Sequence, residues 1–64
     1  EPQYCIFIED IARNLKPAHE LGMKTVWIKN NEPWAAKYSD EKFVNYKTSN
    51  LTNFLKEINE LREN

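Results

Sequence analysis

Two short apolar runs on either side of one helical segment constrain the fold of this chain most strongly. Residues 4–8 read Tyr-Cys-Ile-Phe-Ile without polar alternation, and residues 25–28 read Thr-Val-Trp-Ile. Such runs are typical of strands that are buried on both faces of a parallel sheet. Strand, short helix and strand together predict a βαβ unit with parallel strands and a right-handed crossover.

The segment between the two runs, residues 11–21, has the spacing of a helix. Its apolar residues recur three or four positions apart, at Ile11, Leu15, Ala18 and Leu21. Pro17 suits only a first helical turn, so the regular helix is expected to begin near Lys16, with an irregular lead-in before it. Gly22 is expected to end this helix in the C′ position.

The rest of the chain predicts a loop, a third strand and a closing helix. Residues 29–42 are polar, and we expect Trp34 to plug the end of the sheet there, with contact to a partner as the alternative. Residues 43–47 alternate and predict a short strand nearer an edge of the sheet. Residues 48–50 supply an N-cap for the closing helix. Trp27 is expected to be a core residue that packs beneath this helix. The apolar stripe of that helix comprises Leu51, Phe54, Leu55, Ile58 and Leu61.

The length of the chain limits how large a core it can form. It has 64 residues, of which 41% are apolar and 30% charged, a composition typical of a folded segment. A chain this short buries only about 60% of its unfolded surface, and two helices hardly cover both faces of apolar strands. We therefore interpret residues 1–64 as one segment of α/β class, the C-terminal β-α-β-β-α portion of a larger protein with a Rossmann-like parallel sheet.

Charge and cysteine content argue against several classes of function. Nine basic and ten acidic residues give a net charge of −1, which argues against a nucleic-acid surface and against a polybasic membrane anchor. No apolar run approaches the roughly 18 residues of a membrane span. The single cysteine, Cys5, cannot form an internal disulfide, so we expect a buried, inert thiol and a reduced, cytoplasmic compartment.

An acidic pair, Glu9 and Asp10, follows the first apolar run. Ligands of open parallel sheets bind outside the carboxyl ends of the strands, which is where this pair is expected to lie. The two carboxylates could cap the following helix, or they could hold a hard cation such as Mg²⁺. Asn14, one turn further on, could then orient the acid or a bound water.

The sequence of residues 5–28 resembles the fourth motif of the haloacid dehalogenase (HAD) superfamily of hydrolases. It reads Cys-Ile-Phe-Ile-Glu-Asp-Ile-Ala-Arg-Asn-Leu-Lys-Pro-Ala-His-Glu-Leu-Gly-Met-Lys-Thr-Val-Trp-Ile. The shared features are an apolar strand that ends in an acidic pair, a helix that ends in Gly-Met, and a Thr-Val strand. The form of the motif looks most like the pyrimidine 5′-nucleotidase branch, and residues 43–55 are similar to the ending of that branch.

The resemblance implies a Mg²⁺-dependent phosphatase that acts on a phosphorylated small molecule, such as a nucleotide monophosphate. In that family an aspartate attacks phosphorus, and the fourth-motif acid holds the metal. Carried over, Asp10 becomes the metal ligand, Glu9 a second acid and Asn14 a supporting group. Ile11 stands where the family often has Ser or Thr, and the Asp-x-Asp nucleophile motif is absent from these 64 residues. The chain alone is therefore expected to be inactive.

A non-catalytic function is the alternative. In this interpretation the chain is a small α/β module that uses its apolar faces to associate with itself or with another chain.

Overall fold

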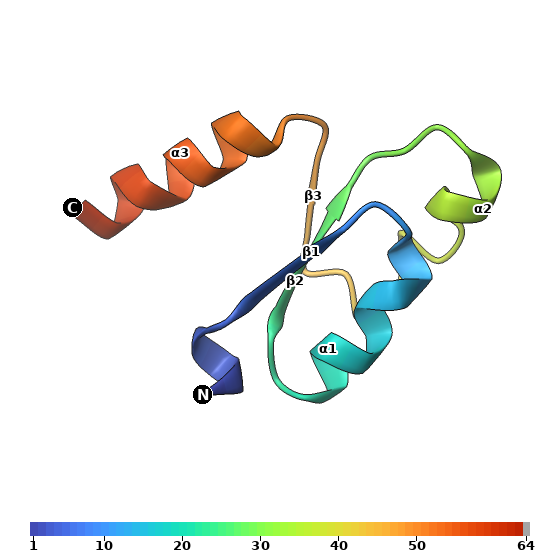
Figure 1. Ribbon diagram of the computed structural model, residues 1–64, viewed down its shortest axis with the longest axis horizontal. Helices are drawn as coiled ribbons and strands as arrows, with labels where there is room; N and C mark the ends of the chain where they lie inside the picture. Colours follow the sequence, from blue (N-terminus) through green and yellow to red (C-terminus); the bar gives the residue numbers. More distant parts are fainter. Residues whose placement is uncertain (64) are drawn as a thin grey trace.

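The computed structural model describes residues 1–63, with side chains as far as residue 60 (Figure 1). Its class is α/β, as the sequence predicts. The elements in chain order are η1 (Pro2–Tyr4), β1 (Ile6–Glu9), η2 (Ala12–Leu15), α1 (Lys16–Glu20), β2 (Lys24–Ile28), α2 (Pro33–Ala36), β3 (Tyr46–Thr48) and α3 (Leu51–Glu63). No helix in this described part has the length and apolar character needed to cross a membrane.

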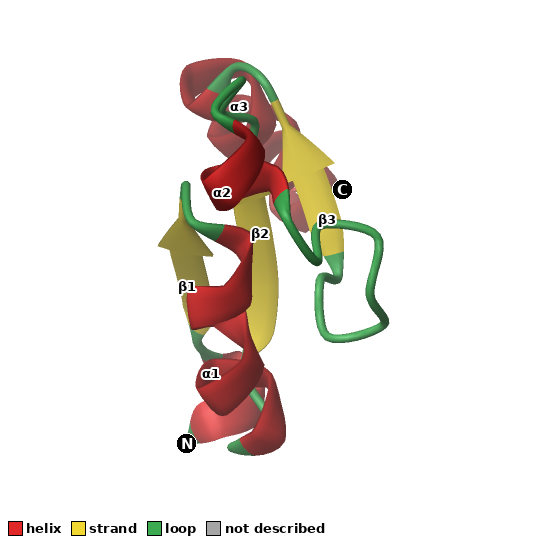
Figure 2. Ribbon diagram, turned by 90° about the vertical axis from the view of Figure 1, so that its right-hand side faces the viewer, coloured by secondary structure: helices red, strands yellow, loops and turns green. Residues whose placement is uncertain are grey.

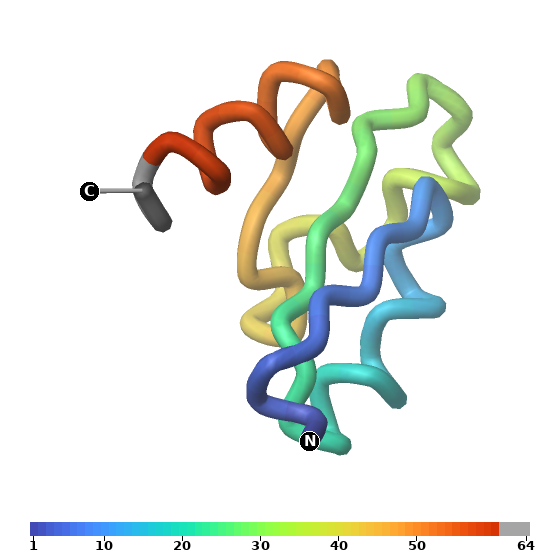
Figure 3. Tube along the Cα trace, turned by 60° about the vertical axis from the view of Figure 1, so that its left-hand side comes forward, coloured from blue at the N-terminus to red at the C-terminus, as the bar shows by residue number. Residues whose placement is uncertain are grey.

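The three strands form one parallel sheet in the order β1-β2-β3. Figure 3 shows β1 and β3 on opposite sides of β2. Ile8 of β1 pairs with Val26 of β2, which pairs in turn with Tyr46 of β3. The predicted βαβ unit is therefore confirmed, and so is the edge position of the third strand.

The crossover between β1 and β2 begins irregularly, as the position of Pro17 predicts. Residues 12–15 form the 3₁₀ turn η2, and α1 begins at Lys16 with Pro17 in its first turn. Gly22 follows α1 with a φ of +94°, a backbone conformation that favours glycine. A helix of five residues is too short to be stable by itself, so the burial of Leu15 and Ala18 holds this crossover in place.

The core lies on the face of the sheet that η2 and α1 cover. Ala12 and Leu15 pack there against Trp27 of β2, with Phe43 and Val44 partly buried beside them. Figure 2 shows α1 and α2 on this side of the sheet and α3 on the other. Trp27 is thus a core residue as expected, but the prediction that it packs beneath the last helix was wrong. The register places Trp27 beside Glu9, on the face toward η2.

The opposite face is only partly covered. The ring of Phe54 in α3 lies 5.8 Å from the ring of Tyr46, while Tyr4 is 83% exposed and Ile6 43% exposed. The prediction that residues 4–8 are buried on both faces was therefore wrong, because β1 is an edge strand and α3 follows the opposite edge strand, β3. Cys5 is also exposed, so the prediction of a buried thiol was wrong for the same reason.

Thr25 of the central strand holds the segment before β3 through hydrogen bonds. Its hydroxyl is fully buried, donates to the main-chain carbonyl of Phe43 and accepts from the N–H of Asn45 at 2.9 Å. The N–H of Thr25 donates to Oδ1 of Asn45 at 2.9 Å. These side-chain bonds take the place of strand pairing, which explains why β3 begins at Tyr46 rather than at the predicted residue 43.

The segment predicted as a polar loop contains one helical turn, α2. Ala35 is the residue of α2 that is fully buried, and Trp34 beside it is 52% exposed. The prediction that Trp34 plugs the sheet was therefore wrong, because the small Ala35 and not the large indole faces the core.

The N-cap predicted for the last helix is confirmed. Asn50 accepts a hydrogen bond from the N–H of Asn53 at 3.0 Å, in the capping geometry expected for this residue type. The predicted apolar stripe includes Leu61, whose side chain lies outside the described residues.

The role of Thr25 leads to a stability prediction. Thr25→Val is expected to lower the free energy of unfolding by about 1–3 kcal/mol, because it leaves the Phe43 carbonyl and the Asn45 N–H without their partner. Chemical denaturation checks this value. Thr52→Val, on the exposed surface of α3, is the matched control and is expected to change little. Equal effects of the two substitutions would show that the buried hydroxyl contributes nothing.

Candidate functional site

The acidic pair lies at the carboxyl end of the sheet. Glu9 is the last residue of β1, and Asp10 follows it directly. Glu9 is partly buried, whereas Asp10 and Asn14 are exposed. The structure therefore brings the three predicted site residues to the edge where open parallel sheets bind their ligands.

The carboxylate of Glu9 organises the turn that follows the strand. Its Oε2 accepts hydrogen bonds from the main-chain N–H of Asp10 at 2.9 Å and of Ile11 at 3.2 Å. Its Oε1 accepts from the side-chain amide of Asn14 at 3.4 Å. Glu9 thus holds the turn between β1 and η2, and Asn14 supports Glu9 rather than Asp10.

Asp10 is held by residues at the end of the neighbouring strand. Its main-chain carbonyl accepts a hydrogen bond of 2.7 Å from the indole N–H of Trp27, and its Oδ2 accepts one of 3.0 Å from the amide of Asn30. Oδ1 of Asn30 in turn accepts from the N–H of Glu32 at 2.9 Å, which fixes the orientation of that amide. The backbone and one carboxylate oxygen of Asp10 are therefore both positioned.

Sequence reasoning missed the contributions of Asn30 and of the Trp27 indole. A signal for Asn30 was present, because it is the polar residue that follows the second strand by two positions. The carboxyl ends of parallel strands meet at one edge of the sheet, so polar residues after both strands approach one another. For the indole N–H no comparable signal exists, since the partner depends on the register of the strands.

The charge state of Asp10 follows from its neighbours. Hydrogen bonding with the Glu9 carboxyl, and next with the Asn30 amide, lowers the pKa of Asp10 from its ordinary value of 3.8. The carboxylate is therefore ionised throughout the physiological pH range. A lowered pKa in the folded state stabilises the fold above pH 3.8, and this contribution is lost as the pH falls through the lowered value.

Asp10 is the residue of this site that suits a hard cation. Its carboxylate is exposed and charged, and the Asn30 amide donates to its Oδ2. Mg²⁺ is commonly held by one or two carboxylates and keeps several waters, so a single exposed carboxylate is a suitable ligand. Both oxygens of Glu9 already accept protein hydrogen bonds. In the described part of the chain, no three His, Cys, Asp or Glu side chains are grouped as metal ligands.

Comparison with known proteins does not assign this chain to a family. No protein-family model, curated protein or solved structure matches it.

The contact between Asp10 and Asn30 leads to a titration prediction. Asn30→Ala is expected to raise the pKa of Asp10 toward 3.8, because it removes a donor that favours the charged form. The carboxyl carbon of Asp10, followed by NMR from neutral to acid pH, reports this value. Asn31→Ala is the matched control, and an equal change in both variants would exclude a role for the Asn30 contact.

Proposed function

We propose that this chain supplies the metal-binding acid of a Mg²⁺-dependent phosphatase of the HAD type. The observation that carries the proposal is the ionised, exposed carboxylate of Asp10 at the carboxyl end of a parallel sheet. The order of elements, β1-η2-α1-β2, supports it, since this is the arrangement that the resemblance implies. The Rossmann-like sheet of a larger protein is part of the same proposal.

Each residue at the site has a defined task in this proposal. Bound Mg²⁺ would screen the repulsion between carboxylate and phosphate and stabilise negative charge on the transferring oxygens. Asp10 holds the ion through its carboxylate. Asn30 and Trp27 fix the position of Asp10, and Glu9 holds the turn that presents it. Glu9 acts on the metal through water in this arrangement, because its own oxygens are engaged.

The nucleophile has to come from another segment of polypeptide. No Asp-x-Asp motif occurs in the 64 residues, and an aspartyl-phosphate cannot form without an aspartate in line with phosphorus. We therefore propose that the purified chain does not hydrolyse phosphate esters even with excess Mg²⁺. The substrate in this proposal is a phosphorylated small molecule, such as a nucleotide monophosphate, in the cytoplasm.

A non-catalytic function is the second candidate, and the uncovered face of the sheet favours it. The chain exposes 4917 Å², whereas a compact monomer of its mass of 7.6 kDa exposes about 4,300 Å². A groove of about 380 Å³ runs between the sheet and α3. It is lined by Ile6, Lys24, Tyr46, Phe54, Glu57 and Ile58.

The second candidate predicts self-association. The sedimentation mass of the chain is expected to rise with concentration, because exposed apolar residues on an edge strand favour pairing. Ile6→Lys is expected to reduce this association. Leu21→Lys is the matched control, since Leu21 is also exposed but lies at the end of α1. A mass that stays monomeric at all concentrations would reject this candidate.

The phosphatase proposal predicts a graded series of losses. Asp10→Asn in the full-length protein that contains this segment is expected to lower turnover at saturating Mg²⁺ by about a hundredfold or more. A neutral amide cannot balance the charge of Mg²⁺ and phosphate together. Glu9→Gln is expected to cost less activity, and Asn14→Ala less again, because both act through the turn.

Thermal unfolding of the same three variants separates catalysis from folding. Asp10→Asn is expected to leave stability nearly unchanged, because its main-chain bond with Trp27 remains. If Asp10→Asn keeps near-normal turnover, or if turnover falls only in step with stability, the metal assignment is wrong and Asp10 is a structural residue.

A further inference from the structure

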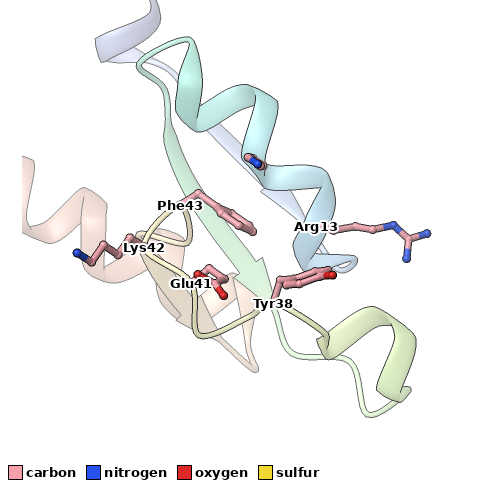
Figure 4. Close-up of a pocket in the computed structure, with 6 residues that line it drawn as sticks. Arg13, Tyr38, Glu41, Lys42 and Phe43 are labelled. Carbon is pink, nitrogen blue, oxygen red and sulfur yellow. The ribbon is translucent and has the colours of Figure 1, made fainter.

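A second depression lies on the side of the sheet that carries α1, and it includes none of Glu9, Asp10 and Asn14. Its volume is about 670 Å³, within the range of roughly 300–1,000 Å³ found for small-molecule sites. It lies between the start of the crossover helix and the loop from α2 to β3 (Figure 4). The residues that line it are Arg13, Lys16, Tyr38, Glu41, Lys42 and Phe43.

The charge around this depression differs from that of the chain as a whole. Three of its lining residues, Arg13, Lys16 and Lys42, are basic and exposed, and one, Glu41, is acidic. None of the three basic groups forms an ion pair within the described residues. The chain carries a net charge of −1, so this local surplus of positive charge favours an anion at this place.

Two aromatic rings form the wall on the loop side. Figure 4 shows the rings of Tyr38 and Phe43 directed into the space between loop and helix, with Arg13 and Lys42 extending on opposite sides of them. Tyr38 is 47% exposed, so its ring is accessible to a ligand. Nζ of Lys37 lies 5.2 Å from the centroid of the Tyr38 ring and adds a fourth cation nearby.

The loop that carries these rings is fixed by its own hydrogen bonds. The N–H of Glu41 donates to the carbonyl of Tyr38 at 3.1 Å, and an ion pair joins Asp40 to Lys47 of β3. The carbonyl of Phe43 accepts from the buried hydroxyl of Thr25. Tyr38 itself has a φ of +71°, a left-handed conformation that a tyrosine keeps only where its surroundings hold it. The wall of the depression is therefore formed before any ligand binds.

We propose that this depression binds a small aromatic anion, a planar ring that carries a phosphate group. The ring stacks on Tyr38 and Phe43, and the positive charge of the basic groups around the rim attracts the phosphate. Extended nucleic acid fits less well, because the net negative charge of the chain repels a polyanion beyond this local patch. The inference rests on residues that the proposed phosphatase site does not use, so it stands or falls independently of that proposal.

Amide NMR of the complete chain tests the proposal with 1-naphthyl phosphate, at low salt and with a chelator that removes divalent metals. Shifts confined to residues 13–16 and 37–43, with a dissociation constant of about 1 mM, are expected. Arg13→Gln and Lys42→Gln are each expected to weaken binding about two- to fivefold. Lys56→Gln, an exposed cation of α3 outside the depression, is the matched control and is expected to have no effect.

The contribution of the ring is tested separately. Tyr38→Gly removes the ring and suits the positive φ, so this variant is expected to fold and to lose most of the binding. Neutral 1-naphthol and inorganic phosphate are each expected to bind more weakly than the naphthyl phosphate. Equal binding of inorganic phosphate, shifts centred on residues 9–10, or tighter binding of a short oligonucleotide with shifts beyond the depression would each overturn the proposal.

Discussion

The indole of Trp27 connects the core of this chain to its candidate site. The apolar part of the Trp27 side chain is buried in the core, where it is only 6% exposed and packs against Ala12 and Leu15. Its polar group, the indole N–H, donates a hydrogen bond to the main-chain carbonyl of Asp10. A buried indole needs a partner for its N–H, so packing and hydrogen bonding select the same position of the turn after β1. The placement of the candidate metal ligand therefore depends on a core residue of the neighbouring strand.

The two faces of the sheet are held by different means. On the face that η2 and α1 cover, the hydrophobic core holds the crossover in place. On the same face, the Thr25 hydroxyl holds the segment before β3 through hydrogen bonds. On the other face, α3 reaches the sheet through the ring of Phe54 beside that of Tyr46. The aromatic, basic depression lies on the well-packed face, and the candidate carboxylate at the carboxyl end of the sheet is bonded to Trp27 of that face. The open face has the exposed apolar surface that favours association.

Local sequence pattern accounts for much of the architecture. The parallel βαβ unit, the irregular lead-in before Lys16, the turn at Gly22 and the cap at Asn50 follow from residue types whose conformational preferences act over a few positions. The location of Glu9 and Asp10 at the end of β1 follows from the same pattern. The exposed state of residues 4–6 does not, because exposure depends on which elements cover a strand and not on the strand itself.

The sequence by itself determined the order of the elements, the parallel direction of the first two strands and the edge of the sheet at which the acidic pair lies. Only the tertiary structure decided that Asp10 is held by Trp27 and Asn30. It also decided that Ala35 faces inward and Trp34 outward. The physical reason is that helix propensity and the hydrogen bonds of Glu9 within its turn act between near neighbours in sequence. The contacts of Asp10 with Trp27 and Asn30 join residues 17 and 20 positions apart and exist only once the strands have paired in register.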